Sequence, residues 1–188
     1  MHHVLPFYGR YQHRFLKAYM ALAKLTRIPL LGRLVRWLAN QYAANQHGGY
    51  LLTLEEAEGI IDASNNVALG PCSCRQVFGN CHRPILSEIV VGAGQEVYSG
   101  LNGHNFRQVS KDEAKEIVRQ CHHQGMMHTI IHCQGLFYAI CNCCTCCCVP
   151  FRLRRDYGIE YAIVRNKNII ADYQKQWLLA GSGGASAD

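Results

Sequence analysis

Cysteine is the residue type that points to chemistry in this chain. Nine of its eleven cysteines fall in two short segments. The first, PCSCRQVFGNC, contains Cys72, Cys74 and Cys81, and the second, CNCCTCCC, contains Cys141, Cys143, Cys144, Cys146, Cys147 and Cys148. Structural cysteines are usually scattered along apolar faces, and a run this dense cannot point entirely into one apolar core. These nine residues are therefore candidate metal ligands.

Crowded thiolates repel one another, and a soft metal neutralises them. Structural zinc usually takes two separated ligand pairs, and neither segment has that form. Iron-sulfur clusters accept varied spacing, often with one ligand remote in the sequence. We therefore predict at least one 4Fe-4S cluster, with three ligands from the first segment and completion from the second. Nine ligands would also serve two clusters or one of higher nuclearity.

The other cysteines and the nearby histidines are weaker candidates. Cys121 and Cys133 lie in segments with helix and strand patterns, where cysteine is more often a buried apolar residue. His82, His128 and His132 are close in sequence to the cysteines, and imidazole ligands occur in Rieske-type centres. A core or surface role fits these histidines better.

Three arginines lie near the cysteine segments in the sequence. Arg75, Arg83 and Arg152 would offset the negative charge of a thiolate-ligated cluster and raise its potential. Alternatively, these three arginines are ordinary surface residues whose charges are solvated.

Two helices are predicted on either side of the first cysteine segment. Each begins with a capping box, in which a Ser or Thr is followed three residues later by Glu. Thr53 and Glu56 form the first pattern, and Ser110 and Glu113 form the second. We expect helices to about residue 64 and from about residue 111 to residue 124.

Short strands lead into the cysteines. Residues 67–69 read as a strand that delivers the chain to Cys72. Residues 129–133 and 136–140 read as a hairpin with the tight turn Gln134-Gly135. Residues 161–164 and 169–173 suggest a second hairpin. Since adjacent residues of a strand point to opposite faces, CNCCTCCC is expected at a turn that enters a helix.

The N-terminal segment is basic and amphipathic. Apolar residues recur at helical spacing over about residues 11–44, with a break at Pro29. Seven cations precede the first acid, Glu55: Arg10, Arg14, Lys17, Lys24, Arg27, Arg33 and Arg36. We favour packing of the apolar face on the domain. Residues 10–44 could instead contact a partner, a second copy or an anionic membrane surface. No motif indicates nucleic-acid binding.

These patterns predict an α+β fold, with a helical basic N-terminal segment packed on a small mixed domain of short antiparallel strands and cysteine-rich loops. The expected divisions are 1–48 for the basic segment, 49–180 for the iron-sulfur domain and 181–188 for a flexible tail. No run of about 18 apolar residues and no signal peptide is evident. Because dense thiols need reducing conditions, we expect a cytoplasmic protein, with peripheral membrane contact as an alternative.

Several motifs together carry a family resemblance. PCSCR at 71–75, CHRP at 81–84, GMMH at 125–128 and ICNCCTCCC at 140–148 resemble a group of ferredoxin-like iron-sulfur proteins of anaerobic bacteria and archaea. The similarity extends from about Ile28 to Leu153. Two features of the group are missing: a further cysteine soon after Pro84, and the usual C-terminal ferredoxin repeats. The resemblance implies cluster binding without a conventional ferredoxin module.

The favoured function is electron transfer or redox sensing through a cluster, together with a redox partner protein. We find no acid-base pair, nucleotide loop or nucleophile motif, which favours electron transfer over catalysis. An enzyme would be a small-molecule reductase with an open or unusual cluster. A third alternative is the handling of zinc or copper by CNCCTCCC.

Overall fold

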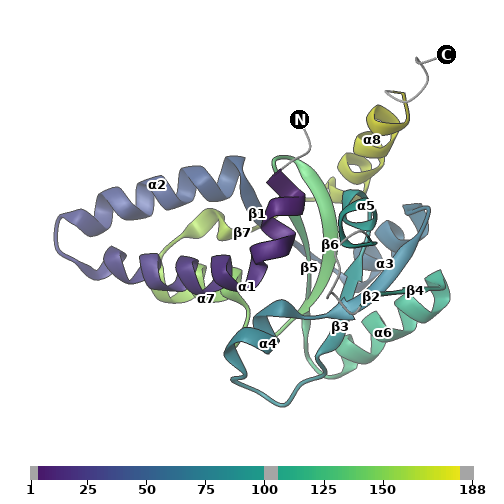
Figure 1. Ribbon diagram of the computed structural model, residues 1–188, viewed down its shortest axis with the longest axis horizontal. Helices are drawn as coiled ribbons and strands as arrows, with labels where there is room; N and C mark the ends of the chain where they lie inside the picture. The colour runs from purple at the N-terminus through teal and green to yellow at the C-terminus, as the bar shows by residue number, and fades with distance from the viewer. Residues whose placement is uncertain (1–3, 100–105, 183–188) are drawn as a thin grey trace.

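The computed structural model describes residues 4–99 and 106–182 and contains one mixed sheet with helices on both faces (Figure 1). The strand order is β4-β2-β3-β6-β5-β1-β7. Neighbouring strands are antiparallel except β1 and β7, which are parallel. The predicted α+β class is confirmed. The strands are β1 His47–Leu52, β2 Val67–Pro71, β3 Leu86–Val90, β4 Arg107–Val109, β5 Met127–Cys133, β6 Leu136–Cys143 and β7 Ile163–Arg165.

The helices lie before, between and after these strands. The α-helices are α1 Val4–Ala23, α2 Leu31–Asn45, α3 Leu54–Ala63, α4 Ser73–Phe78, α5 Ala93–Ser99, α6 Lys111–His123, α7 Val149–Tyr157 and α8 Ile169–Ser182. Two short 3-10 helices are η1 Lys24–Arg27 and η2 Glu160–Ala162. Within the described residues, no helix has the length and apolar composition that crossing a membrane requires.

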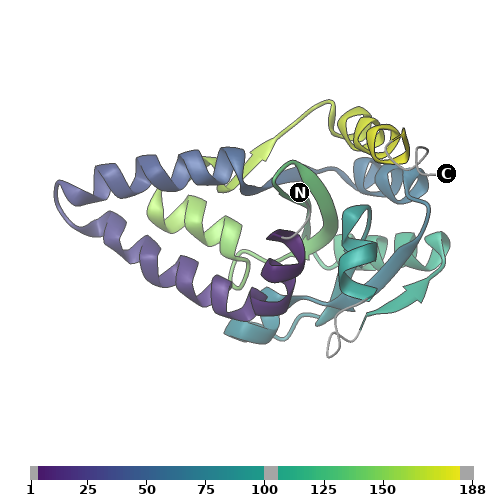
Figure 2. The ribbon, with the colours of Figure 1, turned by 45° about the horizontal axis from the view of Figure 1, so that its top comes forward.

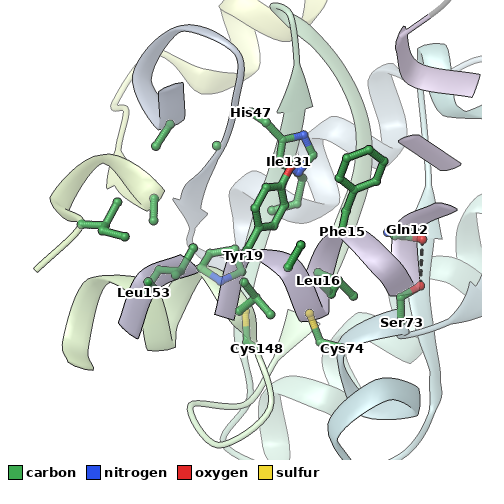
Figure 3. A pocket seen from close by; sticks show the side chains of 18 of the residues that line it. Gln12, Phe15, Leu16, Tyr19, His47, Ser73, Cys74, Ile131, Cys148 and Leu153 are labelled. Carbon is green, nitrogen blue, oxygen red and sulfur yellow. Dashed lines mark hydrogen bonds between the residues drawn. The ribbon is translucent and has the colours of Figure 1, made fainter. Parts of the chain in front are cut away.

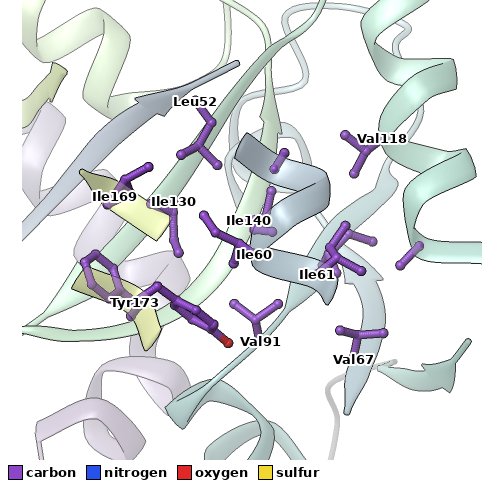
Figure 4. Close-up of a cluster of buried hydrophobic side chains, with 14 of the residues drawn as sticks. Leu52, Ile60, Ile61, Val67, Val91, Val118, Ile130, Ile140, Ile169 and Tyr173 are labelled. Carbon is purple, nitrogen blue, oxygen red and sulfur yellow. The ribbon is translucent and has the colours of Figure 1, made fainter. Parts of the chain in front are cut away.

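The two faces of the sheet bury alternate residues of each strand. Ile130 and Ile140 contribute to a cluster with side chains of α3, α6 and α8, such as Ile60 (Figure 4). Their chain neighbours Ile131 and Ala139 belong to a second cluster with side chains of α1 and α5. Because successive strand residues point to opposite faces, a strand covered on both sides reads as a continuous apolar run.

The capping boxes behave as predicted at α3 and in part at α6. Thr53 accepts a hydrogen bond from the Glu56 backbone N–H, and the Glu56 carboxylate accepts one from the Thr53 backbone N–H. Ser110 likewise accepts from the Glu113 backbone N–H. The Glu113 carboxylate instead accepts a hydrogen bond from Arg107 of β4. A tertiary ion pair thus replaces half of the second box.

One predicted hairpin is confirmed and the other is wrong. β5 and β6 are joined by Gln134 and Gly135, both at positive φ (50° and 79°), as expected for a tight hairpin turn. After η2, by contrast, β7 pairs in parallel with β1, and residues 169–173 begin α8. Ile169 and Tyr173 are both fully buried in the core beneath α3. Their spacing of four residues therefore reflects one face of a helix.

The basic N-terminal segment forms a helical hairpin that packs on the sheet and on α7, as predicted (Figures 1 and 2). Leu16 and Met20 of α1 and Ala43 of α2 are buried against Val149 of α7. The outer surface leaves large apolar side chains in solvent, including Trp37. The boundary predicted at residue 48 falls within β1. Gly181 and Ser182 end α8, and residues 183–188 of the predicted tail lie outside the described residues.

Candidate metal centre

Sheet topology explains why the two cysteine segments meet. β3 lies between β2 and β6 and is antiparallel to both, so β2 and β6 run in the same direction. Their C-terminal ends therefore lie at the same edge of the sheet. Cys72 follows β2 and is the N-cap of α4, while Cys148 follows the turn after β6 and is the N-cap of α7. The predicted turn into a helix is confirmed for the second half of CNCCTCCC, whereas Cys141 and Cys143 lie among the last residues of β6.

Four cysteines form an outer thiol group: Cys81, Cys144, Cys146 and Cys147. Their sulfur atoms all lie within 4.8 Å of one another and could hold a metal ion. The Sγ of Cys81 is 3.6 Å from that of Cys144 and 3.7 Å from that of Cys147. Four thiolates about 2.3 Å from one tetrahedral ion would lie about 3.8 Å apart. The outer thiol group therefore has the dimensions of a site for a single ion.

The five other cysteines of the two segments line one cavity and are called the inner thiol group: Cys72, Cys74, Cys141, Cys143 and Cys148. The Sγ of Cys143 is 3.4 Å from that of Cys148 and 3.5 Å from Oγ1 of Thr129. Cys143 also contacts the Cys141 thiol, and Cys148 contacts the Cys74 thiol. Figure 3 shows Cys74 and Cys148 near each other below α1. Cys81 therefore lies apart from Cys72 and Cys74, although all three belong to the first cysteine segment.

Hydrogen bonding makes one thiol in each group acidic. Bonds from the thiols of Cys141 and Cys148 hold the pKa of Cys143 well below its usual range. Burial opposes ionisation of Cys144, but hydrogen bonds from the Cys147 backbone and from neighbouring thiols, including Cys81, lower its pKa to about 7. Each group therefore contains a thiol disposed to become a thiolate, the form that binds metals.

A buried cation lies between the two thiol groups. Arg75 of α4 is 3% exposed and donates hydrogen bonds to the Asn142 carbonyl oxygen and to Ser87. Although burial lowers the pKa of Arg75, the charges of Cys72 and other cysteines raise it overall. Of the three arginines considered from the sequence, Arg75 lies in the position to offset thiolate charge. Arg83 instead donates to the Gln124 carbonyl oxygen, and Arg152 stacks over Phe78.

Glu88 is a buried acid beside the inner thiol group that sequence reasoning missed. It lies opposite Cys141 in the β3–β6 register. Burial first, and then the nearby Cys143, raise the pKa of Glu88 to about 8. The sequence did contain a signal for Glu88: it is a single acid in a mostly apolar stretch, directly before Ile89 and Val90. Asn80, also missed, donates to the Cys146 carbonyl oxygen and so joins the Cys81 loop to the second cysteine segment.

The weaker candidates lie elsewhere. Cys121 and Cys133 are both buried, and neither belongs to the four-cysteine site. His82 is exposed. His128 bonds to Asn142 and His122, and His132 stacks on Tyr50. These contacts account for His128 as a structural residue, whereas the buried Nδ1 of His132 has no hydrogen-bond partner among the described residues.

A cavity of about 600 Å³ adjoins both thiol groups and extends beneath the N-terminal hairpin. The inner thiols, with Cys144 and Cys147 of the outer thiol group, line one part of it. Mostly apolar side chains of α1, α2 and α7 line the remainder, together with His47 at the start of β1 (Figure 3). The thiols are thus reachable from a large apolar space.

The fold and the outer thiol group define a cysteine-rich α+β protein with a site that could hold a metal ion. Comparison with protein-family models gives no match. Comparisons with curated proteins and with solved structures give no significant match either.

Proposed function

We propose that this protein is an iron-sulfur protein that transfers electrons or senses redox state, with a cluster held by the inner thiol group. The observation that carries this proposal is the convergence of nine cysteines, from two distant segments, into two adjacent groups. The inner thiol group offers more sulfur ligands than one tetrahedral ion uses. A 4Fe-4S cluster would take three or four of the five thiolates, one on each iron, and its binding would move Cys143 and Cys148 farther apart than their present 3.4 Å.

The surroundings of the inner thiol group support a redox centre. Arg75 supplies a buried positive charge, which favours the more negative reduced state of a cluster. Mostly apolar side chains line the cavity beside these thiols, and the polarity of the surroundings is one of the factors that set cluster potential. A 4Fe-4S cluster in this position would exchange single electrons with a redox partner protein. The resemblance of the cysteine motifs to ferredoxin-like iron-sulfur proteins supports the same assignment.

The test is elemental analysis of protein purified without oxygen. Iron and acid-labile sulfide in similar amounts, together with a Mössbauer spectrum of a cluster, are expected. EPR of the reduced protein then reports whether the centre accepts one electron. Protein that contains neither iron nor sulfide would overturn the proposal.

A second candidate function, soft-metal handling, is favoured by the geometry of the outer thiol group. Its sulfur separations match one tetrahedral zinc ion or a similar soft ion. In a 4Fe-4S cluster each thiolate binds a different iron, which places the sulfur atoms farther apart. Zinc or copper without sulfide, at variable loading, would support handling of these metals. Zinc together with iron and sulfide would indicate a single zinc ion in the outer thiol group and a cluster in the inner thiol group.

A further inference from the structure

The cavity beneath the N-terminal hairpin is open to solvent at one end and reaches the thiols at the other. Leu22 of α1 and Leu38 and Tyr42 of α2 line it and are about half exposed (58%, 52% and 45%). The opening therefore lies between α1 and α2. The hydroxyl groups of Tyr19 and Tyr42 are 2.8 Å apart and join the two helices there. A volume of about 600 Å³ is in the range of cavities that hold cofactors or other small molecules.

The charges along the wall restrict the ligand to a neutral one. Arg75 is the one lysine or arginine among the lining residues. Its two terminal nitrogens are bonded to Asn142 and Ser87, and among the described residues its Nε has no partner. Glu88 is the one acid. A carboxylate or phosphate ligand would therefore lose its water and meet at most one free N–H, on a cation whose charge already interacts with Cys72, Cys143 and Cys144. Fatty acids, haem and flavin nucleotides carry such groups and fit poorly.

One region of the wall is built for a flat ring. The ring of His47 lies 4.4 Å from that of Tyr8 and 6.1 Å from that of Tyr138, measured between centroids. Tyr19 lies beside the same histidine, as Figure 3 shows. Aromatic side chains of this kind pack well against a planar conjugated ligand.

His47 also has a free polar atom. Among the described residues, its buried Nδ1 has no hydrogen-bond partner. Burial first, and then the neighbouring His132, lower the pKa of His47 to about 3, so the imidazole is neutral at pH 7. A neutral imidazole with hydrogen on Nδ1 can donate to a carbonyl oxygen, and a buried donor without a partner is costly.

We propose that this cavity binds a neutral, fully substituted quinone, with a ring carbonyl accepting a hydrogen bond from His47 and an apolar tail directed towards the opening between α1 and α2. A quinone combines the flat ring, the carbonyl acceptor and the lack of charge that the wall favours. This inference draws on the proposed function in one respect, since a redox-active ligand belongs beside a redox-active metal centre.

The probe is decylubiquinone, whose ring carries a substituent at every position and so offers no open carbon for thiolate addition. Protein purified without oxygen, with its metals, is titrated with the probe by calorimetry. Retained quinone is then extracted and quantified after gel filtration. One quinone per chain is expected.

Two variants locate the bound quinone. His47→Phe keeps a ring and removes the donor, while Ala39→Phe fills space in the cavity wall. Each should weaken binding about tenfold or more, and His13→Phe, the same exchange at an exposed position of α1, should leave it unchanged. Should Ala39→Phe fail to fold, Ala39→Leu provides a smaller change of the same kind.

Three results would overturn the assignment: no retained quinone, retention that neither cavity variant reduces, or displacement by decanoic acid at similar concentration. The last would mark a general lipid site. Metal analysis of the same samples separates the two proposals. Quinone bound by protein without iron and sulfide would uphold the cavity and defeat the proposed cluster. Iron and sulfide in protein that binds no quinone would support the proposed cluster and overturn the proposed quinone site.

Discussion

Cys143 and Cys144 are neighbours in the chain, yet their thiols belong to different groups. The Sγ of Cys143 lies 3.4 Å from that of Cys148 in the inner thiol group. The Sγ of Cys144 lies 3.6 Å from that of Cys81 in the outer thiol group. The peptide bond between them thus connects two candidate centres, and the buried Arg75 interacts with both thiols. Loss or oxidation of one centre should therefore alter the metal binding or the potential of the other.

Single cysteine substitutions should remove the centres separately. Cys81→Ala removes one of four outer ligands and should abolish binding of the outer ion while leaving inner iron and sulfide in place. Cys143→Ala should show the opposite pattern, because Cys143 is the most acidic inner thiol. Metal and sulfide analysis of anaerobically purified variants measures both.

The matched control is Cys121→Ala, at a buried cysteine of α6 outside the four-cysteine site. It should keep the metal content of the original protein. If Cys81→Ala loses iron and sulfide along with the outer ion, the two groups form one centre.

Arg75→Gln should make the midpoint potential of the inner centre more negative. The guanidinium is buried near Cys72, Cys143 and Cys144, and its positive charge favours the reduced state. Removing that charge raises the free energy of adding an electron. A redox titration followed by EPR measures the shift. Arg152→Gln, at a cation that stacks on Phe78, is the control and should shift the potential less. Equal shifts would show that Arg75 has no special role.

His47 should make the protein less stable as pH falls from about 6.5 towards 3. Burial lowers the pKa of His47 to about 3 in the folded chain, whereas the unfolded chain titrates near 6.5. Between these values the unfolded state binds more protons, so the free energy of unfolding decreases by about 1.4 kcal/mol per pH unit.

His47→Phe should remove this contribution, which amounts to about 2 kcal/mol between pH 6.5 and pH 5. Urea unfolding at pH 7 and pH 5, with equal metal loading, measures the difference between the variant and the original protein. His13→Phe changes an exposed histidine and should retain the original dependence. The same pH dependence in all three proteins would contradict a neutral His47 in the folded chain.

Leu30→Gly should stabilise the hairpin by about 1 kcal/mol. Leu30 lies between α1 and α2 at φ 65°, and the Leu31 N–H donates to the Pro29 carbonyl oxygen at 2.7 Å in a tight turn. Such a conformation is strained for a residue with a Cβ, and glycine adopts it readily. Leu30 is 92% exposed, so its loss removes little packing.

Chemical denaturation measures this change, and Leu34→Gly provides the matched control. Leu34 is 53% exposed within α2, where glycine should destabilise by about 1 kcal/mol. A destabilising effect at both positions would show that the turn at Leu30 is unstrained.

Local signals predicted much of the fold because they depend on residues close in the chain. The Thr53–Glu56 capping box and the Gln134-Gly135 turn each satisfy backbone groups a few residues away. The same limit explains the wrong hairpin after residue 160. Short apolar runs fit a strand or a helix, and burial of Ile169 and Tyr173 beneath α3 decides between them.

The sequence by itself determined that nine of the eleven cysteines are concentrated in two short segments. Only the tertiary structure decided how they are shared, because β3 lies between β2 and β6 and brings both segments to one edge of the sheet. The approach of Cys81 to Cys144, the burial of Arg75 and Glu88, and the cavity beside His47 all join residues far apart in the chain. Periodicity and spacing cannot encode such contacts, since these arise from packing of the whole fold.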